Sequence, residues 1–289
     1  MKRILLFVAT NLAIMITISI VLAVLGIGGY RLPGGGLDYS ALMVFSLVWG
    51  MGGALISLAI SRFMAKQAMG VQLVDGRTGH EELDWLYATV RQLTERDGLP
   101  MPEVGFYDSP ELNAFATGPS KNRSLVAVSS GLLRSMQRDE VEGVLAHEVS
   151  HIANGDMVTM TLIQGVVNAF VLFFSRVIAS LLRRGDDRSG YAVEMITTIV
   201  LQIVLGLLGS IVVAWFSRAR EFRADAGSAA LAGRHKMIAA LERLQNRTEI
   251  DNRAPSLATL KINGGRGVLS LLASHPPLEQ RIAALRSAR

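Results

Sequence analysis

Four long apolar runs constrain the fold of this chain more than any other feature of its sequence. They cover residues 4–29, 39–60, 157–182 and 191–216. The hydrocarbon core of a bilayer needs about 20 apolar residues per helix, and each run is long enough to supply them. Short polar segments join the first run to the second and the third to the fourth. The sequence therefore predicts four membrane helices in two hairpins.

The first hairpin carries positive charge at both of its ends. Lys2 and Arg3 precede the first run, and Arg62 and Lys66 follow the second. Because positive residues favour the cytoplasmic side, both ends are predicted to lie there. A cleaved signal peptide has an apolar region of only about 7–15 residues, so we expect the first run to remain as an anchor.

The second hairpin is less regular. Its connecting loop, residues 183–190, carries three arginines, which opposes the positive-inside bias if the loop lies outside the cytoplasm. Partial insertion of this hairpin is therefore an alternative to full crossing. The two runs also contain Asn168, Arg176 and Glu194. Arg176 and Glu194 lie near the segment ends, where we expect their charged groups to extend to the membrane interface.

The remaining residues predict a compact α+β unit and a helical C-terminal part. Apolar spacing favours helices at 78–96 and 138–153, with Asp139 as N-cap and Asn154-Gly155 as a left-handed stop. Strand-like pieces lie at 103–107, 114–117 and 124–129. Helical patterns resume over 217–245, a loop is expected at 247–267, and a last helix begins near Pro276.

The strongest chemical signal is the segment His147-Glu-Val-Ser-His151. Residues i and i+4 of a helix project from one face, so the two imidazoles can reach one tetrahedral ion. Glu148 lies beside them and can take a proton from a water molecule at that ion. The alternative is a helix that carries two histidines by chance. The chain has only 5 histidines, and two of them lie here, which favours the metal site.

A catalytic metal needs a third protein ligand. The chain has no cysteine, so that ligand is a histidine, an aspartate or a glutamate. Glu221 is the chosen candidate, and Asp225, one helical turn further, can orient a ligand histidine. The alternative is a solvated helix face on which both acids pair with nearby arginines. Since the second hairpin lies between His151 and Glu221, the chain must leave and return on one side of the membrane, which predicts a metal close to its cytoplasmic surface.

The whole chain resembles the HtpX-type membrane zinc endopeptidases of bacteria. It is more distantly similar to the prenyl-protein-processing membrane proteases of eukaryotes. The resemblance rests on four segments, which are Asn113-Ala-Phe-Ala-Thr-Gly118, the run from His147 to Gly165, Arg220-Glu-Phe-Arg-Ala-Asp225 and Ser274-His-Pro-Pro277.

The resemblance implies a zincin-like catalytic domain that holds one Zn²⁺ per chain. His147, His151 and Glu221 match the ligands, Glu148 the general base and Asp225 the residue that orients a ligand. His275 matches a position that can stabilise the oxyanion, and otherwise is only a helix-start histidine. Asn113, Ala114, Phe115 and Ala116 match an edge strand that binds substrate by adding a strand.

These observations together predict a mainly α membrane protein with a zincin-like α+β catalytic domain in two parts. The expected division is 1–62 for the N-terminal transmembrane hairpin, 63–156 and 217–289 for the catalytic domain, and 157–216 for the second hairpin. The resemblance implies cleavage of misfolded or damaged membrane proteins under stress, at the cytoplasmic face of the bacterial inner membrane.

The expected partners are therefore polypeptides and the lipid bilayer. Nucleic acid is not expected, because the basic residues are scattered and not interleaved with aromatic residues. Two other functions stay open, a prenyl-protein-type processing protease and a non-enzymatic membrane scaffold with a structural metal site.

Overall fold

The computed structural model describes residues 2–27, 29–33, 36–183, 188–252, 273 and 275–288. The chain divides into two compact units, each made of two segments. The helical unit comprises Met1–Leu58 and Thr159–Val213, and the mixed unit comprises Ala59–Val158 and Ala214–Arg289. The finer division into two hairpins and a two-part catalytic domain stays a prediction.

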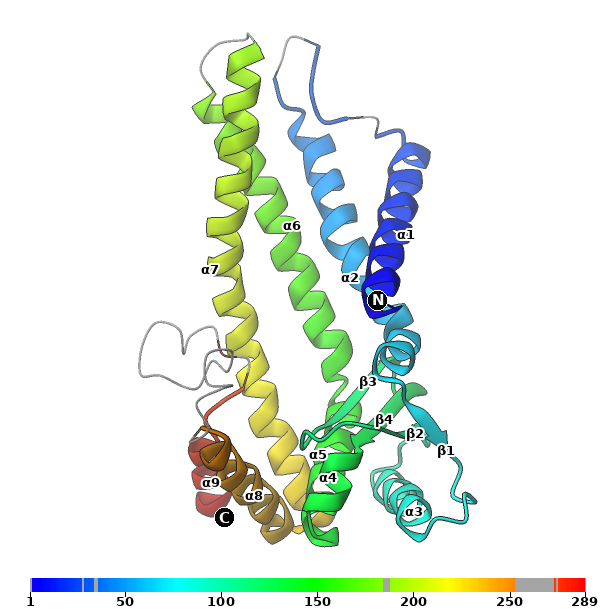
Figure 1. Ribbon diagram of the computed structural model, residues 1–289. Helices are drawn as coiled ribbons and strands as arrows, with labels where there is room; N and C mark the ends of the chain where they lie inside the picture. Colours follow the sequence, from blue (N-terminus) through cyan, green and yellow to red (C-terminus); the bar gives the residue numbers. More distant parts are fainter. Residues whose placement is uncertain are drawn as a thin grey trace. The chain divides into compact units, whose positions relative to one another are not determined.

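Long helices make up the helical unit (Figure 1). They are α1 (Lys2–Val24), α2 (Tyr39–Met69), α6 (Asp156–Leu182) and α7 (Arg188–Ser228). Among the described residues, three helical stretches are long and apolar enough to cross a bilayer, namely α2, α6 and Gly190–Asn246. The apolar stretch described for α1, Val8–Val24, is shorter. Three of the four predicted membrane helices are thus supported. The fourth helix, and with it the arrangement in two hairpins, stays a prediction.

Small residues bring these helices close together. Gly50 of α2 lies against α6, where a Cβ added to Gly50 would stand 2.5 Å from the backbone nitrogen of Ala169. Gly165 of α6 lies in turn against Met51. Because lipid and side chains are equally apolar, such close packing is a main source of helix association in membranes.

Gly50→Val is therefore expected to push α2 away from α6. The added atoms would overlap the Ala169 backbone, and overpacking of this kind costs about 1–3 kcal/mol. We expect a lower thermal midpoint in detergent. Gly53→Ala is the matched control, since a Cβ there would meet only Ile18 Cδ1 at 3.9 Å. Equal midpoints for the two variants would contradict the packing argument.

Charged side chains near the end of α6 and the start of α7 form a cluster with residues that follow α1. Glu194 is 4% exposed, and its carboxylate lies 2.7 Å from Arg31 Nη2 and 3.5 Å from Arg183 Nη1. Arg176 donates a hydrogen bond from Nε to the Tyr30 hydroxyl at 3.1 Å. Ion pairing thus holds Glu194 inside the protein, and its position at the membrane interface stays a prediction. Arg183, which counted against crossing, is paired in the same way.

The mixed unit contains a sheet of four strands in the order β1-β2-β4-β3 (Figure 1). The strands are β1 (Gln72–Val74), β2 (Glu103–Tyr107), β3 (Ala114–Ser120) and β4 (Arg123–Ser129). β2 and β4 are parallel, whereas β1–β2 and β3–β4 are antiparallel. The three predicted strands are confirmed, and the short β1 was not foreseen. The order leaves one edge of β3 without a partner strand among the described residues.

Helices cover both faces of this sheet. Val104, Val126 and Val128 form one core with α3 (Glu81–Arg96) and α5 (Arg138–Asn154). On the opposite face, Tyr107, Leu125 and Ala127 pack against Ala65 and Met69, the last turns of α2. The burial of both faces explains why β4 is buried at every position after Arg123.

Helix α5 begins and ends with specific caps. Gln137 is the N-cap and forms a reciprocal capping box with Glu140. The prediction of Asp139 as N-cap is wrong, because Asp139 already lies in the first turn. Gly155 ends the helix with φ 67° and ψ 29°, a left-handed conformation that glycine adopts without strain. The predicted stop is therefore confirmed.

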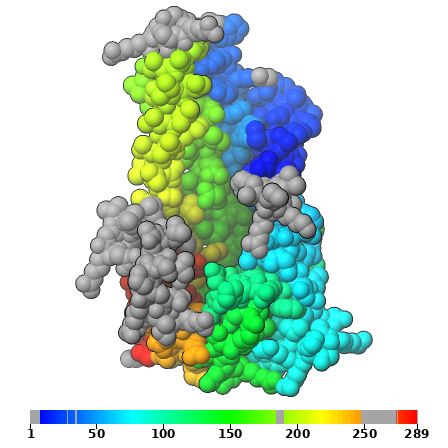
Figure 2. Space-filling view, viewed as in Figure 1, coloured from blue at the N-terminus to red at the C-terminus, as the bar shows by residue number. Residues whose placement is uncertain are grey.

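The C-terminal part is helical beyond the predicted range. α7 continues into a π-helical turn, η1 (Ala229–Gly233), and then into α8 (Arg234–Asn252). The loop predicted at 247–267 is wrong for 247–252, which are helical, and its remaining residues lie outside the described residues. The final helix α9 (Leu278–Ser287) follows Pro276 and Pro277 and confirms the predicted last helix. Figure 2 shows the same chain with its side chains.

Candidate metal centre

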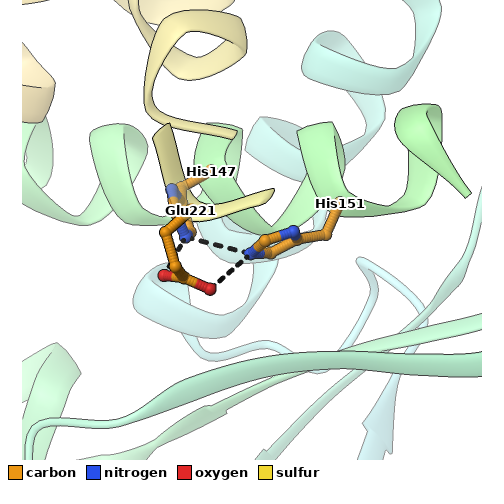
Figure 3. A group of neighbouring side chains, drawn as sticks. All are labelled: His147, His151 and Glu221. Carbon is orange, nitrogen blue, oxygen red and sulfur yellow. Dashed lines mark hydrogen bonds and ion pairs between the residues drawn. The ribbon is translucent and has the colours of Figure 1, made fainter. Parts of the chain in front are cut away.

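Three side chains from two helices meet in the mixed unit. His147 and His151 project from α5, and Glu221 reaches them from α7 (Figure 3). The Nε2 atoms of the two histidines are 3.1 Å apart. Each lies 3.5 Å from a different oxygen of the Glu221 carboxylate. One ligand atom from each residue thus points into a common space, within 4.8 Å of the others.

These separations fit a tetrahedral divalent ion. Two ligands at about 2.0–2.1 Å from a tetrahedral metal are about 3.3 Å apart, close to the 3.1 and 3.5 Å observed. Glu221 is only 2% exposed, and its Oε1 atom is buried with no hydrogen-bond partner among the described residues. A buried carboxylate oxygen is costly unless a cation or donor satisfies it. The residues therefore fit a metal.

The other ring nitrogen of each histidine is held by an aspartate. His147 Nδ1 lies 3.0 Å from Asp225 Oδ1, and His151 Nδ1 lies 2.7 Å from Asp156 Oδ2. Both aspartates are almost fully buried. A carboxylate at Nδ1 keeps the proton there, so the Nε2 lone pair faces the common space. Asp225 lies where the resemblance implied, whereas no role was foreseen for Asp156.

Asp156→Asn is expected to weaken metal binding by about 10–100-fold, because the amide cannot act as the same acceptor for His151 Nδ1–H. The dissociation constant would be measured by competition with a chelator of known affinity. Glu95→Gln, which changes an exposed acid paired with Arg91 across one helical turn, is the control. Equal metal affinity in wild type and Asp156→Asn would show that this contact does not orient the ligand.

Arg281 is a further residue of the site that the sequence analysis missed. It lies on α9, is 6% exposed, and donates from Nε and Nη2 to the two oxygens of Asp225 at 2.7 and 2.5 Å. Its Nη1 lies 3.4 Å from Glu221 Oε2. The sequence does contain an indication of this contact. Arg281 lies on the apolar stripe that Leu278, Ile282 and Leu285 define, and a charged residue that is buried on such a stripe nearly always has a partner of opposite charge.

The electrostatics of the cluster favour positive charge at His147. Burial disfavours the protonated ring, but hydrogen bonds with Asp225 and Glu221 outweigh it and raise the pKa of His147 to about 9. The carboxylates around the ring therefore stabilise a cation, whether a proton or a metal ion supplies the charge.

Glu148 and His275 lie at the same site with different exposure. Glu148 follows His147 on α5, is half-buried, and forms no hydrogen bond or ion pair with another described residue. His275 is 61% exposed at its side chain, and its Nδ1 lies 3.1 Å from Glu221 Oε2. Ser274, the preceding residue of the Ser274–Pro277 segment, lies outside the described residues.

The predicted substrate segment lies at and just before β3, the strand at one edge of the sheet. Ala114, Phe115 and Ala116 pair with Val128, Ala127 and Val126 of β4. Asn113 precedes the strand, and its carbonyl accepts a hydrogen bond from Ser129 N at 2.9 Å. β3 also contacts α5, which carries the histidines.

A paired His-Glu-x-x-His helix, a remote glutamate and apolar helices on the same chain define the class of membrane-bound metallopeptidases. The comparisons with known proteins agree with this class. Residues 81–289 match the description "Peptidase family M48". The chain belongs to peptidase family M48, and it is a membrane-bound metalloprotease.

Named relatives match over the full chain. The chain is 52% identical over 294 residues to "Protease HtpX" of Shewanella loihica, covering 99% of this chain and 100% of the relative. It is 53% identical over 293 residues to "Protease HtpX homolog" of Nitrosomonas eutropha, covering all of both. The expected HtpX-type resemblance is thus confirmed, and membership of a peptidase family favours an enzyme over the scaffold.

A solved structure supports the fold alone. The crystal structure of S. mikatae Ste24p matches 98% of this chain with a TM-score of 0.66 and 20% sequence identity. This chain spans 64% of the length of that one. The likeness covers both the helical and the mixed unit.

Proposed function

We propose that this chain is a zinc endopeptidase of the bacterial inner membrane that cleaves misfolded or damaged membrane proteins at the cytoplasmic face. The observation that carries the proposal is the continuity of the site with the apolar helices. Glu221 follows the apolar run of α7 by five residues, or about 8 Å along the helix at 1.5 Å per residue. Asp156, which holds His151, is the first residue of α6.

His147, His151 and Glu221 would hold the ion, and two nitrogens with one carboxylate oxygen favour zinc. When bound, zinc supplies positive charge at the scissile carbonyl oxygen and acidifies water. Asp225 and Asp156 keep protons on the Nδ1 atoms of their histidines. Glu148 accepts a proton from the attacking water and passes it to the leaving nitrogen, so that water adds across the peptide bond. His275, whose Nδ1 lies 3.1 Å from Glu221 Oε2, would donate a hydrogen bond to the carbonyl oxygen.

The substrate would bind as an added strand on β3 at Asn113–Ala116. Backbone hydrogen bonds from an edge strand are tolerant of side-chain identity, which suits a protease that removes damaged proteins of many sequences. An extended chain is also the form in which a peptide bond can reach the metal ligands on α5.

The proposal is tested with purified protein stripped by a chelator and reloaded with single metals. Cleavage is followed for an unfolded membrane protein in liposomes and for a prenylated peptide. Zinc-restored cleavage of the membrane protein is the expected result. Cleavage of the prenylated peptide alone would favour the processing protease, and restoration only by another ion would refute zinc.

Orientation is tested with single cysteines, which the cysteine-free chain makes possible. Lys121→Cys lies on an exposed turn of the mixed unit and Leu32→Cys in the loop after α1. In intact spheroplasts, a membrane-impermeant maleimide should label position 32 and reach position 121 only after lysis. The opposite pattern would overturn the cytoplasmic assignment.

A further inference from the structure

Helix α6 carries a pair of amide side chains in the middle of an apolar sequence. Gln164 Nε2 donates a hydrogen bond to Asn168 Oδ1 at 2.8 Å, and both residues are exposed. Because they are four residues apart, they lie on one face of the helix. The Gln164 carbonyl oxygen and the Asn168 NH₂ group form no other hydrogen bond with described residues. Thr161 lies on the same face, one turn earlier.

The position of this polar face is set by the helices on either side. Gly165 and Ala169 contact α2, and Val167 and Val171 contact Gly209 of α7. On a helix of roughly 3.6 residues per turn, Gln164 and Asn168 fall between these two sets. The opposite face of α6 carries exposed apolar side chains, at Leu162, Val166 and Phe170. Only one exposed face of α6 is therefore suited to lipid.

Exposed amides within a hydrocarbon region need a polar partner, because lipid offers neither donors nor acceptors. Each carboxamide offers both, and the pair leaves one acceptor and one donor group open. This combination matches a peptide backbone in extended form, whose N–H and C=O groups are unsatisfied in lipid. A helical segment satisfies its own backbone and would not use the pair in this way.

We propose that Gln164 and Asn168 bind the unwound end of a substrate's membrane-spanning segment on its way to the metal centre. The inference rests on the proposed function, which requires membrane proteins as substrates. A spanning helix must become extended before it can pair with the β3 edge. Gln164 follows Asp156, the first residue of α6, by eight residues in the sequence. The amide pair compensates the backbone groups that unwinding exposes.

The test compares two substrates of the full-length zinc enzyme in liposomes. One is a single-span membrane protein with its cleavage site next to the span, and the other is an unfolded soluble protein. Gln164→Leu/Asn168→Leu should lower the ratio of kcat/KM for the membrane substrate over the soluble one by about tenfold, from two lost hydrogen bonds. Val166→Leu, on the apolar face, is the matched control. A ratio within twofold of wild type would overturn the proposal.

A second readout does not depend on activity. A photo-crosslinking amino acid is placed at position 161, on the polar face, or at position 162, on the apolar face, in the Glu148→Gln background. Crosslinks to the membrane substrate from position 161 and not from 162 are expected. Crosslinks from 161 to a second copy of this chain would instead assign the amides to self-association and overturn the proposal. If the wild type cleaves neither substrate, it is the proposed function that fails.

Discussion

Glu148→Gln is expected to lose peptide cleavage by about 10²–10⁴-fold, the usual contribution of a general base. The amide keeps the size of the side chain but cannot accept a proton from water. Glu148 is half-buried, and it pairs with no other described residue through a hydrogen bond or salt bridge. Its replacement should therefore leave the fold and the ligands in place. Initial rates of cleavage and metal content would be measured on the same preparations.

Glu221→Gln is the informative comparison. It removes a ligand charge from a carboxylate that is 2% exposed, so both metal content and cleavage should fall. If Glu148→Gln also lost the metal, Glu148 would have to be a ligand or a structural residue. If it bound metal and cleaved at the wild-type rate, another group would have to serve as the base.

The candidate metal ligands could be predicted from the sequence to different extents. His147 and His151 follow from helical spacing alone, because i and i+4 positions share a face whatever the rest of the fold does. Glu221 lies 70 positions after His151 in the sequence, and no local rule connects the two. Spacing left Glu221 and a solvated helix face equally open, and only the family resemblance separated them.

The features that the sequence analysis did not predict were missed for different physical reasons. Asp156 starts an apolar run, where an acidic residue is explained as well by the helix dipole as by a contact with His151. Arg281 reaches Asp225 from α9, which packs against α8 through Met237 and Leu241, and no local pattern predicts this contact. The short β1 has three residues, too few for an alternating pattern to be detected.

Helix ends were also poorly predicted, since hydropathy reports what surrounds a side chain and not where a helix ends. α2 runs nine residues past the apolar run that ended at Ile60, because its last turns pack on the sheet. Likewise, the burial of Glu194 could not be predicted, because its partner Arg31 is 163 positions away. Contacts between distant parts of the chain decided both features.

Arg281→Ala should destabilise the mixed unit and weaken metal binding together. The guanidinium forms two hydrogen bonds to Asp225 and lies near Glu221, with 8% of its side chain exposed. Removing one partner of a buried ion pair costs about 3–5 kcal/mol, because the other charge is left uncompensated. At roughly 2–4 °C per kcal/mol for a domain of this size, the thermal midpoint should fall by roughly 10 °C.

Two further variants test whether the effect is specific to Arg281 or follows from the loss of any arginine on α9. Arg286→Ala removes an exposed arginine from the same helix, whose partner Glu242 is also exposed, and exposed pairs contribute only about 0–1 kcal/mol. Arg281→Lys keeps the charge but not the paired hydrogen bonds, so it should lie between wild type and Arg281→Ala. Thermal midpoints and zinc dissociation constants would be measured for all three. If the two alanine variants had the same thermal midpoint and the same zinc dissociation constant, the contact between Arg281 and Asp225 would not help to hold His147 in position. Asp225, the partner of His147 Nδ1, would then have to account for the orientation of His147 without Arg281.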